Sequence, residues 1–232
     1  PCSDFTLARF GAQLRFAYRE ALVQFGKTNL SLQNRYPILY LSYTRSLEGV
    51  LSGQFDYHKL LFGAEYNFFT KGLGRTRGLI QAGWIGGEAP YSMLFNGRGS
   101  YEKGRSFVVR NTFQTMRPNE FVSRHFVYAF IQHDFGTLFF RTRLFQPKFR
   151  IHQAVGFGWL PDKARHINLP ASDMSQGFYE SGLVIADIIR IPVFNYGFLG
   201  FGGGAFIRYG PYSLGNQVMN NVVFKLDMSV SL

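Results

Sequence analysis

The last stretch of the chain, Asn221-Val222-Val223-Phe224-Lys225-Leu226-Asp227-Met228-Ser229-Val230-Ser231-Leu232, alternates apolar and polar side chains over nearly its whole length. Side chains alternate between the two faces of a β-strand, so this stretch predicts a strand with one apolar and one polar face. A soluble protein has to cover such an apolar face with a second layer, whereas a membrane barrel leaves it against lipid. The apolar face of this closing strand carries Phe224, Leu226, Met228, Val230 and Leu232.

The composition of the rest of the chain is compatible with both solutions. The 232 residues include 26 Phe, 13 Tyr and 26 Gly, and 46% of them are hydrophobic. A transmembrane helix is not indicated, because the long uncharged run 191–207 contains Pro192 and several glycines, which break helices. An aromatic-rich and glycine-rich profile is typical of strands that face lipid on one side and water on the other. A soluble β-barrel or sandwich that binds an apolar ligand is the alternative.

Period-two alternation recurs along the whole chain and predicts nine strands. Each strand is near the length that a tilted strand needs to cross a bilayer. For one of them, periodicity alone also allows a short helix over 183–189. The predicted strands cover residues 9–19, 36–44, 54–69, 77–85, 121–135, 148–160, 178–191, 198–209 and 221–232.

The connections between these strands predict a membrane barrel. Short turns near 146–147 and 192–195 alternate with long polar loops at 161–176 and 210–220, and transmembrane barrels have this asymmetry. The longest loop, 86–119, exceeds an ordinary connection and is expected to be functional, with a possible short strand at its end over 107–116.

The predicted fold is therefore all-β, a single antiparallel up-and-down transmembrane β-barrel domain over residues 1–232. Odd strand numbers are rare in bacterial barrels. We therefore expect these nine to ten strands to be the C-terminal part of a larger barrel. By themselves they should form an open, curved sheet with the last strand at an exposed edge.

The polar faces of the predicted strands carry many basic residues, in a chain with a net charge of +11. Large polar groups cannot lie in a dry core without partners, but they can line a water-filled lumen. These residues either favour anionic solutes or acidic client segments, or pair with acids such as Glu65 and Asp227 across the barrel; we favour pairing. The predicted lumen-facing basic residues are Arg9, Arg15, Arg19, Arg77, Arg150 and Arg208.

The order of several short stretches along the chain carries a family resemblance. They are Tyr36-Pro37-Ile38-Leu39, Tyr57-His58-Lys59-Leu60, Ala82-Gly83 with Pro90, Asn119-Glu120-Phe121-Val122-Ser123-Arg124 and Asn221-Val222-Val223-Phe224-Lys225-Leu226. In this order they resemble the C-terminal barrel of an uncharacterised Bacteroidetes outer-membrane family, whose members often carry an N-terminal carboxypeptidase-regulatory-like domain. That family is distantly similar to the bacterial surface-antigen superfamily, the barrels that assemble or export outer-membrane proteins.

The resemblance implies a location and a set of partners. The location is the outer membrane of a Gram-negative bacterium, and the partners are outer-membrane lipid and client or accessory outer-membrane proteins. In the superfamily, five strands follow a long loop whose Arg-Gly-aromatic motif folds into the lumen. Here Arg98-Gly99 is followed by Ser100, with an aromatic residue one place late, and Arg117 is followed by Pro118. Arg98, Gly99 and Arg117 are the candidate motif residues.

Catalysis and nucleic-acid binding find no support in the sequence. The chain lacks a Gly-x-Ser-x-Gly elbow, a P-loop and a His-Glu-x-x-His motif, and its five histidines do not have metal spacing. His133-Asp134 are neighbours in a predicted strand and should therefore point to opposite faces. No recognition helix or ribonucleoprotein motif is present. We therefore expect a protein that is not an enzyme, needs no cofactor and binds no nucleic acid.

Overall fold

The computed structural model describes residues 5–25, 28–33, 36–104, 106–138, 141–161, 172–193, 197–215 and 217–231. Over these residues the chain is all-β, with one nine-stranded antiparallel sheet and two small two-stranded sheets. Among the described residues, no helix is long and apolar enough to span a membrane.

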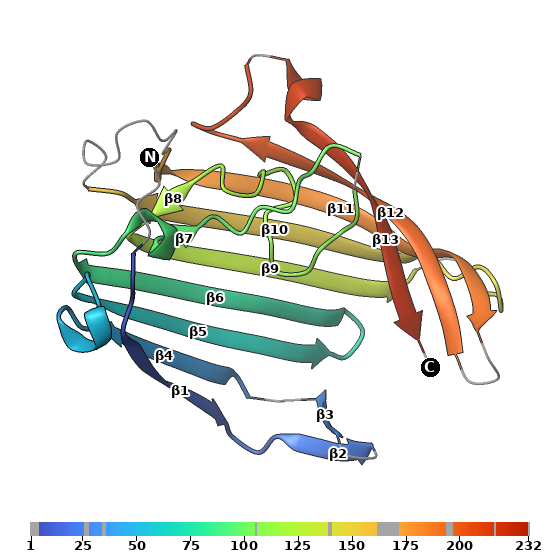
Figure 1. Ribbon diagram of the computed structural model, residues 1–232. Coiled ribbons are helices and arrows are strands. Elements are labelled where there is room, and N and C mark those ends of the chain that lie inside the picture. The colour runs from blue at the N-terminus through green and yellow to red at the C-terminus, as the bar shows by residue number, and fades with distance from the viewer. Residues whose placement is uncertain are drawn as a thin grey trace.

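The large sheet has up-and-down topology, with the strand order β1-β4-β5-β6-β9-β10-β11-β12-β13. It curls but remains open, with β1 and β13 at opposite edges (Figure 1). The predicted antiparallel sheet and its open form with the last strand at an edge are confirmed, and each predicted strand corresponds to one strand of this sheet. The strands are β1 (Arg9–Ala17), β4 (Ile38–Ser46), β5 (Tyr57–Thr70), β6 (Gly74–Gly87), β9 (His125–Thr137), β10 (Lys148–Trp159), β11 (Met174–Val193), β12 (Gly197–Tyr209) and β13 (Val222–Ser231).

Some predictions made from local sequence patterns are wrong, because contacts between distant segments set the backbone conformation there. The hairpin of β2 (Ala21–Phe25) and β3 (Thr28–Gln33) was not predicted. Residues 107–116 form no strand and take part only in isolated bridges, because their backbone pairs with distant segments. The polar loop predicted at 161–176 is shorter, since β11 already begins at Met174; its residues 162–171 lie outside the described parts of the chain.

The helix alternative for 183–189 is also wrong, and a bulge explains why the pattern there is weak. β11 continues through this stretch, but its pairing with β12 skips between Ile185 and Ile189. Asp187 lies inside the bulge with a left-handed φ of 54°. Extra residues in one strand disturb the alternation of side chains. A strand with a bulge therefore loses the period-two signal.

The connections at the two ends of the sheet differ less than predicted, because the end with the β5–β6 turn also carries the connection that contains β2 and β3. At one end, a short turn at 71–73 joins β5 to β6. At the other end lie the longest connection, between β6 and β9, one with the short helix η1 (Val50–Ser52) and one with η5 (Val218–Asn221). The alternation follows from up-and-down topology, in which every second connection lies at the same end.

The convex face of the sheet is apolar and exposed on every strand. In each strand the exposed apolar residues occupy alternate positions, and the cross-strand register keeps them on one face. One exposed residue from each strand, in sheet order, is Phe10, Leu41, Phe62, Ile80, Val127, Ile151, Leu183, Tyr209 and Phe224.

Part of the concave face is covered by the inserted segment, residues 88–124 between β6 and β9 (Figure 1). It contains η2 (Tyr91–Met93), β7 (Phe95–Asn96) and β8 (Val122–Ser123), and the two short strands pair with each other. The segment crosses the inside of the curled sheet instead of extending away from it.

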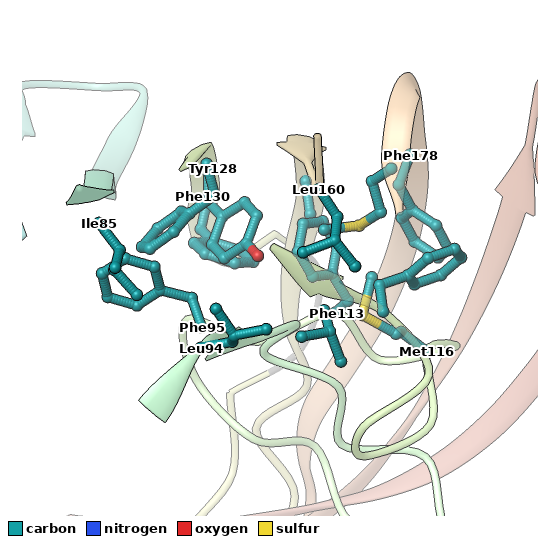
Figure 2. Packing of buried hydrophobic residues seen from close by; sticks show 14 of the residues in the cluster. Ile85, Leu94, Phe95, Phe113, Met116, Tyr128, Phe130, Leu160 and Phe178 are labelled. Carbon is teal, nitrogen blue, oxygen red and sulfur yellow. The ribbon is translucent and has the colours of Figure 1, made fainter. Parts of the chain in front are cut away.

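The hydrophobic core lies between the inserted segment and the sheet. Phe113 is fully buried, and its ring centroid lies 5.5 Å from that of Tyr128, 4.8 Å from that of Phe130 and 5.0 Å from that of Phe178. Figure 2 shows these rings with Met116 beside them. The prediction of a water-filled lumen is therefore wrong for the part of the concave face that lies under the inserted segment, because apolar side chains fill it.

Candidate functional site

A charged cavity occupies the part of the concave face that the core leaves open. Its volume is about 750 Å³, and it is lined by β6, β9, β10, β11, β12, β13, the β5–β6 turn and the inserted segment. The charged groups of the lining are five cationic side chains and three carboxylates: Arg75, Arg77, Arg110, Lys148, Arg150, Asp134, Asp187 and Asp227.

The three carboxylates of the cavity are paired with two of its cations. Arg150 lies 3.1 Å from Asp134 and 3.3 Å from Asp227. Lys148 Nζ lies 2.7 Å from Asp187 Oδ2, and the Ser229 hydroxyl donates a hydrogen bond to Asp187 Oδ1. The ion pair of Arg150 with Asp227 is one instance of the expected pairing between lumen-facing basic residues and acids across the sheet.

Arg208 also faces the concave side, but it lies beside the hydrophobic core and not in the charged cavity. Its guanidinium donates a hydrogen bond of 2.9 Å to Glu120 of the inserted segment and lies 4.8 Å from the centroid of the Phe178 ring. Such contacts fix the position of the group and neutralise its charge. Arg208 thus helps to hold the inserted segment.

The basic residues predicted on the first strand lie in more open surroundings. Arg9 contacts Met93 at 3.1 Å, and Arg15 forms an ion pair with Glu20. The prediction that Arg19 faces the lumen from a strand is wrong. β1 ends at Ala17, and Arg19 lies in the following turn with a left-handed φ of 49°.

Glu180 on β11 fastens the inserted segment to the sheet. Its buried carboxylate accepts hydrogen bonds from the backbone N–H of Gln114 (2.8 Å) and of Thr115 (2.6 Å), and from the Thr115 hydroxyl (2.7 Å). His152 Nε2 lies 3.3 Å from the same carboxylate. Hydrogen bonds to an ionised acceptor are stronger than those between neutral groups. The contact holds the tip of the segment against the sheet.

The candidate motif residues of the inserted segment lie in different environments. Arg98 Nη1 donates a hydrogen bond of 3.0 Å to Gln81 on β6, and burial lowers the pKa of its guanidinium. At Gly99 a Cβ atom would lie 2.3 Å from the carbonyl oxygen of Arg117, so only glycine fits there. Arg117 itself is exposed. The structure thus brings Arg98 to the sheet, packs Gly99 against the backbone of Arg117 within the segment and leaves the Arg117 side chain exposed.

The inserted segment also covers part of the free edge of β13. The N–H of Leu226 donates to Ser106 O (2.7 Å), and the N–H of Val108 donates to Leu226 O (2.8 Å). The Ser106 hydroxyl donates to Phe224 O at 2.8 Å. These bonds satisfy backbone groups that an edge strand otherwise leaves free.

The closing strand has the predicted faces. Phe224, Leu226, Met228 and Val230 are exposed on the convex face, while Lys225 and Asp227 are buried on the concave face. Leu232 lies outside the described residues.

Several residues of the cavity and its surroundings were not predicted. Lys148 lies two positions before Arg150 in the same strand and therefore faces the same side, so the alternating pattern could have identified it. Arg75 was assigned to a turn, because the predicted strand began two residues later. Glu180 and Asp187 could not be recognised, since one acts through loop backbone and the other lies in the bulge.

His133 and Asp134 lie on opposite faces of the sheet, as expected. His133 faces outward and contacts Thr76 at 2.8 Å, whereas its neighbour Asp134 faces inward toward Arg150. Within the described residues, no group of three or more His, Cys, Asp or Glu side chains is arranged to hold a metal ion.

The chain has no match among protein-family models, curated proteins or solved structures.

Proposed function

We propose that this chain is part of a non-enzymatic integral β-barrel in the outer membrane of a Gram-negative bacterium, with the inserted segment inside the barrel. The observation that carries the proposal is the exposed apolar face on all nine strands of the sheet. Soluble proteins seldom expose a contiguous apolar surface of more than a few hundred Å². Lipid covers such a face without a second protein layer.

The dimensions of the sheet support the same proposal. Its strands run from 9 residues in β1 to 20 residues in β11, and a tilted strand crosses a bilayer with about 9–11 residues. The longest connection, the inserted segment, lies at the end opposite to the short β5–β6 turn, as the long loops of outer-membrane barrels lie opposite to their short turns. Closure of the barrel would require further strands between β1 and β13.

A role in the assembly or export of outer-membrane proteins is the finer part of the proposal. The family resemblance suggests it, and two features support it. Five strands of the large sheet follow the inserted segment, and Arg98 reaches from that segment to the wall of the sheet. Client or accessory outer-membrane proteins would then be the partners.

Cysteine labelling in membranes tests the orientation of the two faces. In a Cys2→Ser background, Leu14→Cys and Phe62→Cys place a thiol on the convex face, and Arg15→Cys and Glu65→Cys place one nearby on the concave face. A membrane-impermeant maleimide should label the second pair in membranes and the first pair only after solubilisation with detergent.

The outcome against the proposal is equal labelling of both pairs in membranes. Fractionation of the native protein gives an independent result. Recovery in the soluble fraction, without detergent, would favour a soluble β protein that binds an apolar ligand on the same face.

A further inference from the structure

Three arginine side chains of the charged cavity lie outside its ion pairs. They are Arg75 and Arg77 on β6 and Arg110 in the inserted segment. Within the described parts of the chain, none of the three guanidinium groups has a hydrogen bond or an ion pair. Arg75 and Arg77 lie two positions apart on the same face of β6, Arg110 lines the same cavity, and Asp134 is the cross-strand neighbour of Arg75. Like charges held together in a partly desolvated site favour the binding of an anion.

The carboxylates of the cavity already form ion pairs with cationic side chains of the protein. Asp134 and Asp227 share Arg150, and Asp187 is paired with Lys148. With five cationic groups against three carboxylates, the charged side chains of the lining carry a net charge of +2. The acids of the cavity therefore neutralise its cationic groups only in part.

The turn that carries Arg110 is held in place by hydrogen bonds. The side chain of Gln114 bonds both the N–H (3.2 Å) and the C=O (2.5 Å) of Val109, and Thr112 Oγ1 donates to Val109 O at 2.9 Å. The backbone N–H of Gln114 is fixed by Glu180. Arg110 is thus presented from an anchored turn, although its own side chain is exposed.

We propose that this cavity binds a small polyvalent oxyanion, such as a phosphate-bearing or carboxylate-bearing metabolite, through Arg75, Arg77 and Arg110. The cavity volume of about 750 Å³ lies in the range of small-molecule sites. The planar guanidinium group binds two oxygens of a phosphate or a carboxylate at once through paired hydrogen bonds.

Calorimetric titration of the purified full-length protein in a non-ionic detergent tests this site. The two probes are sodium pyrophosphate and sodium citrate, each at constant ionic strength. Saturable binding at one site is expected for at least one probe. Binding of pyrophosphate alone would assign a phosphate ligand, binding of citrate alone a carboxylate ligand, and either result supports the site.

Arg77→Gln and Arg110→Gln should each weaken binding by about tenfold or more, because each removes charge-assisted hydrogen bonds. Arg117→Gln is the matched control, since Arg117 belongs to the same segment but lies outside the cavity; its affinity should be unchanged. Arg110 is exposed, so its loss should not prevent folding, and an unchanged thermal unfolding midpoint checks this.

The inference is overturned if neither probe binds saturably, or if Arg117→Gln weakens binding as much as Arg110→Gln. Binding is measured in detergent solution and needs no assumption about the membrane. A negative result would leave the proposed barrel intact, and labelling against the barrel would leave the anion site intact.

Discussion

The two edge strands of the sheet, β1 and β13, have the same alternating pattern but different environments. Every residue of β1 from Arg9 to Phe16 is exposed, on both faces. In β13 the apolar face is equally exposed, yet Lys225 and Asp227 on the polar face are buried. The pattern thus determines which side chains share a face, and the neighbouring segments determine whether that face is covered.

The inserted segment accounts for the difference. It lies against β13, where Lys225 Nζ donates hydrogen bonds of 2.9 Å to both the carbonyl and the hydroxyl oxygen of Ser100. On β1 the corresponding basic residue, Arg15, pairs with Glu20 from the next turn and lies over the Tyr40 ring, 6.0 Å from its centroid. Buried polar groups need such fixed partners, whereas exposed ones can use water.

A substitution that loosens the inserted segment should expose the polar face of β13, as the polar face of β1 is exposed. This substitution should have the largest effect on the free energy of unfolding. Phe113→Ala removes a fully buried ring from the core beneath the segment. We expect a loss of about 3–5 kcal/mol in the free energy of unfolding, because truncation leaves a cavity among packed aromatic rings. Denaturant unfolding in detergent measures the loss, and limited proteolysis of residues 88–124 should become faster.

Phe107→Ala is the control for that experiment, since Phe107 belongs to the same segment but is 48% exposed. Its cost should be below about 1 kcal/mol, as for other exposed substitutions. Equal effects of the two variants would contradict a core built on Phe113.

A second prediction compares the two edge strands directly. Lys225→Ala should cost about 2 kcal/mol, because it removes charge-assisted hydrogen bonds at a buried site. Arg15→Ala should cost less than about 1 kcal/mol, since an exposed ion pair contributes little. Both values come from denaturant unfolding in the same detergent. If Arg15→Ala is the more costly variant, the two strands do not differ in the way described above.

The smallest effect concerns the covered edge of β13. Ser106→Ala removes the hydrogen bond from its hydroxyl to Phe224 O and should cost about 0.5–1 kcal/mol. Amide hydrogen exchange provides a local readout, in which the Leu226 N–H should exchange faster in the variant. Unchanged exchange at Leu226 would mean that this contact does not protect the edge.

Much of the fold could be predicted from the sequence, because period-two alternation is a local property. It located all the strands of the large sheet and the face on which Phe224 and Lys225 lie. It failed at Asp187, where a bulge displaces the alternation. It also failed at Arg19, where the backbone leaves the strand. In both cases the backbone geometry, and not the residue type, sets the direction of the side chain.

The candidate site was less predictable, because its contacts join residues far apart in the chain. The alternation placed Arg150 and Asp227 on the concave face, and the ion pair between them is present. Arg110 lies in the inserted segment, and Glu180 acts through the backbone of that segment. No spacing rule relates a loop residue to the strand that it contacts.

The sequence by itself determined an antiparallel sheet with one apolar and one polar face, since the side-chain period of a strand depends only on local geometry. Only the tertiary structure decided what covers the polar face. The inserted segment fills one part of it with a hydrophobic core and leaves a charged cavity in the other. This outcome depends on where a long connection packs, and packing is set by the fit between distant side chains.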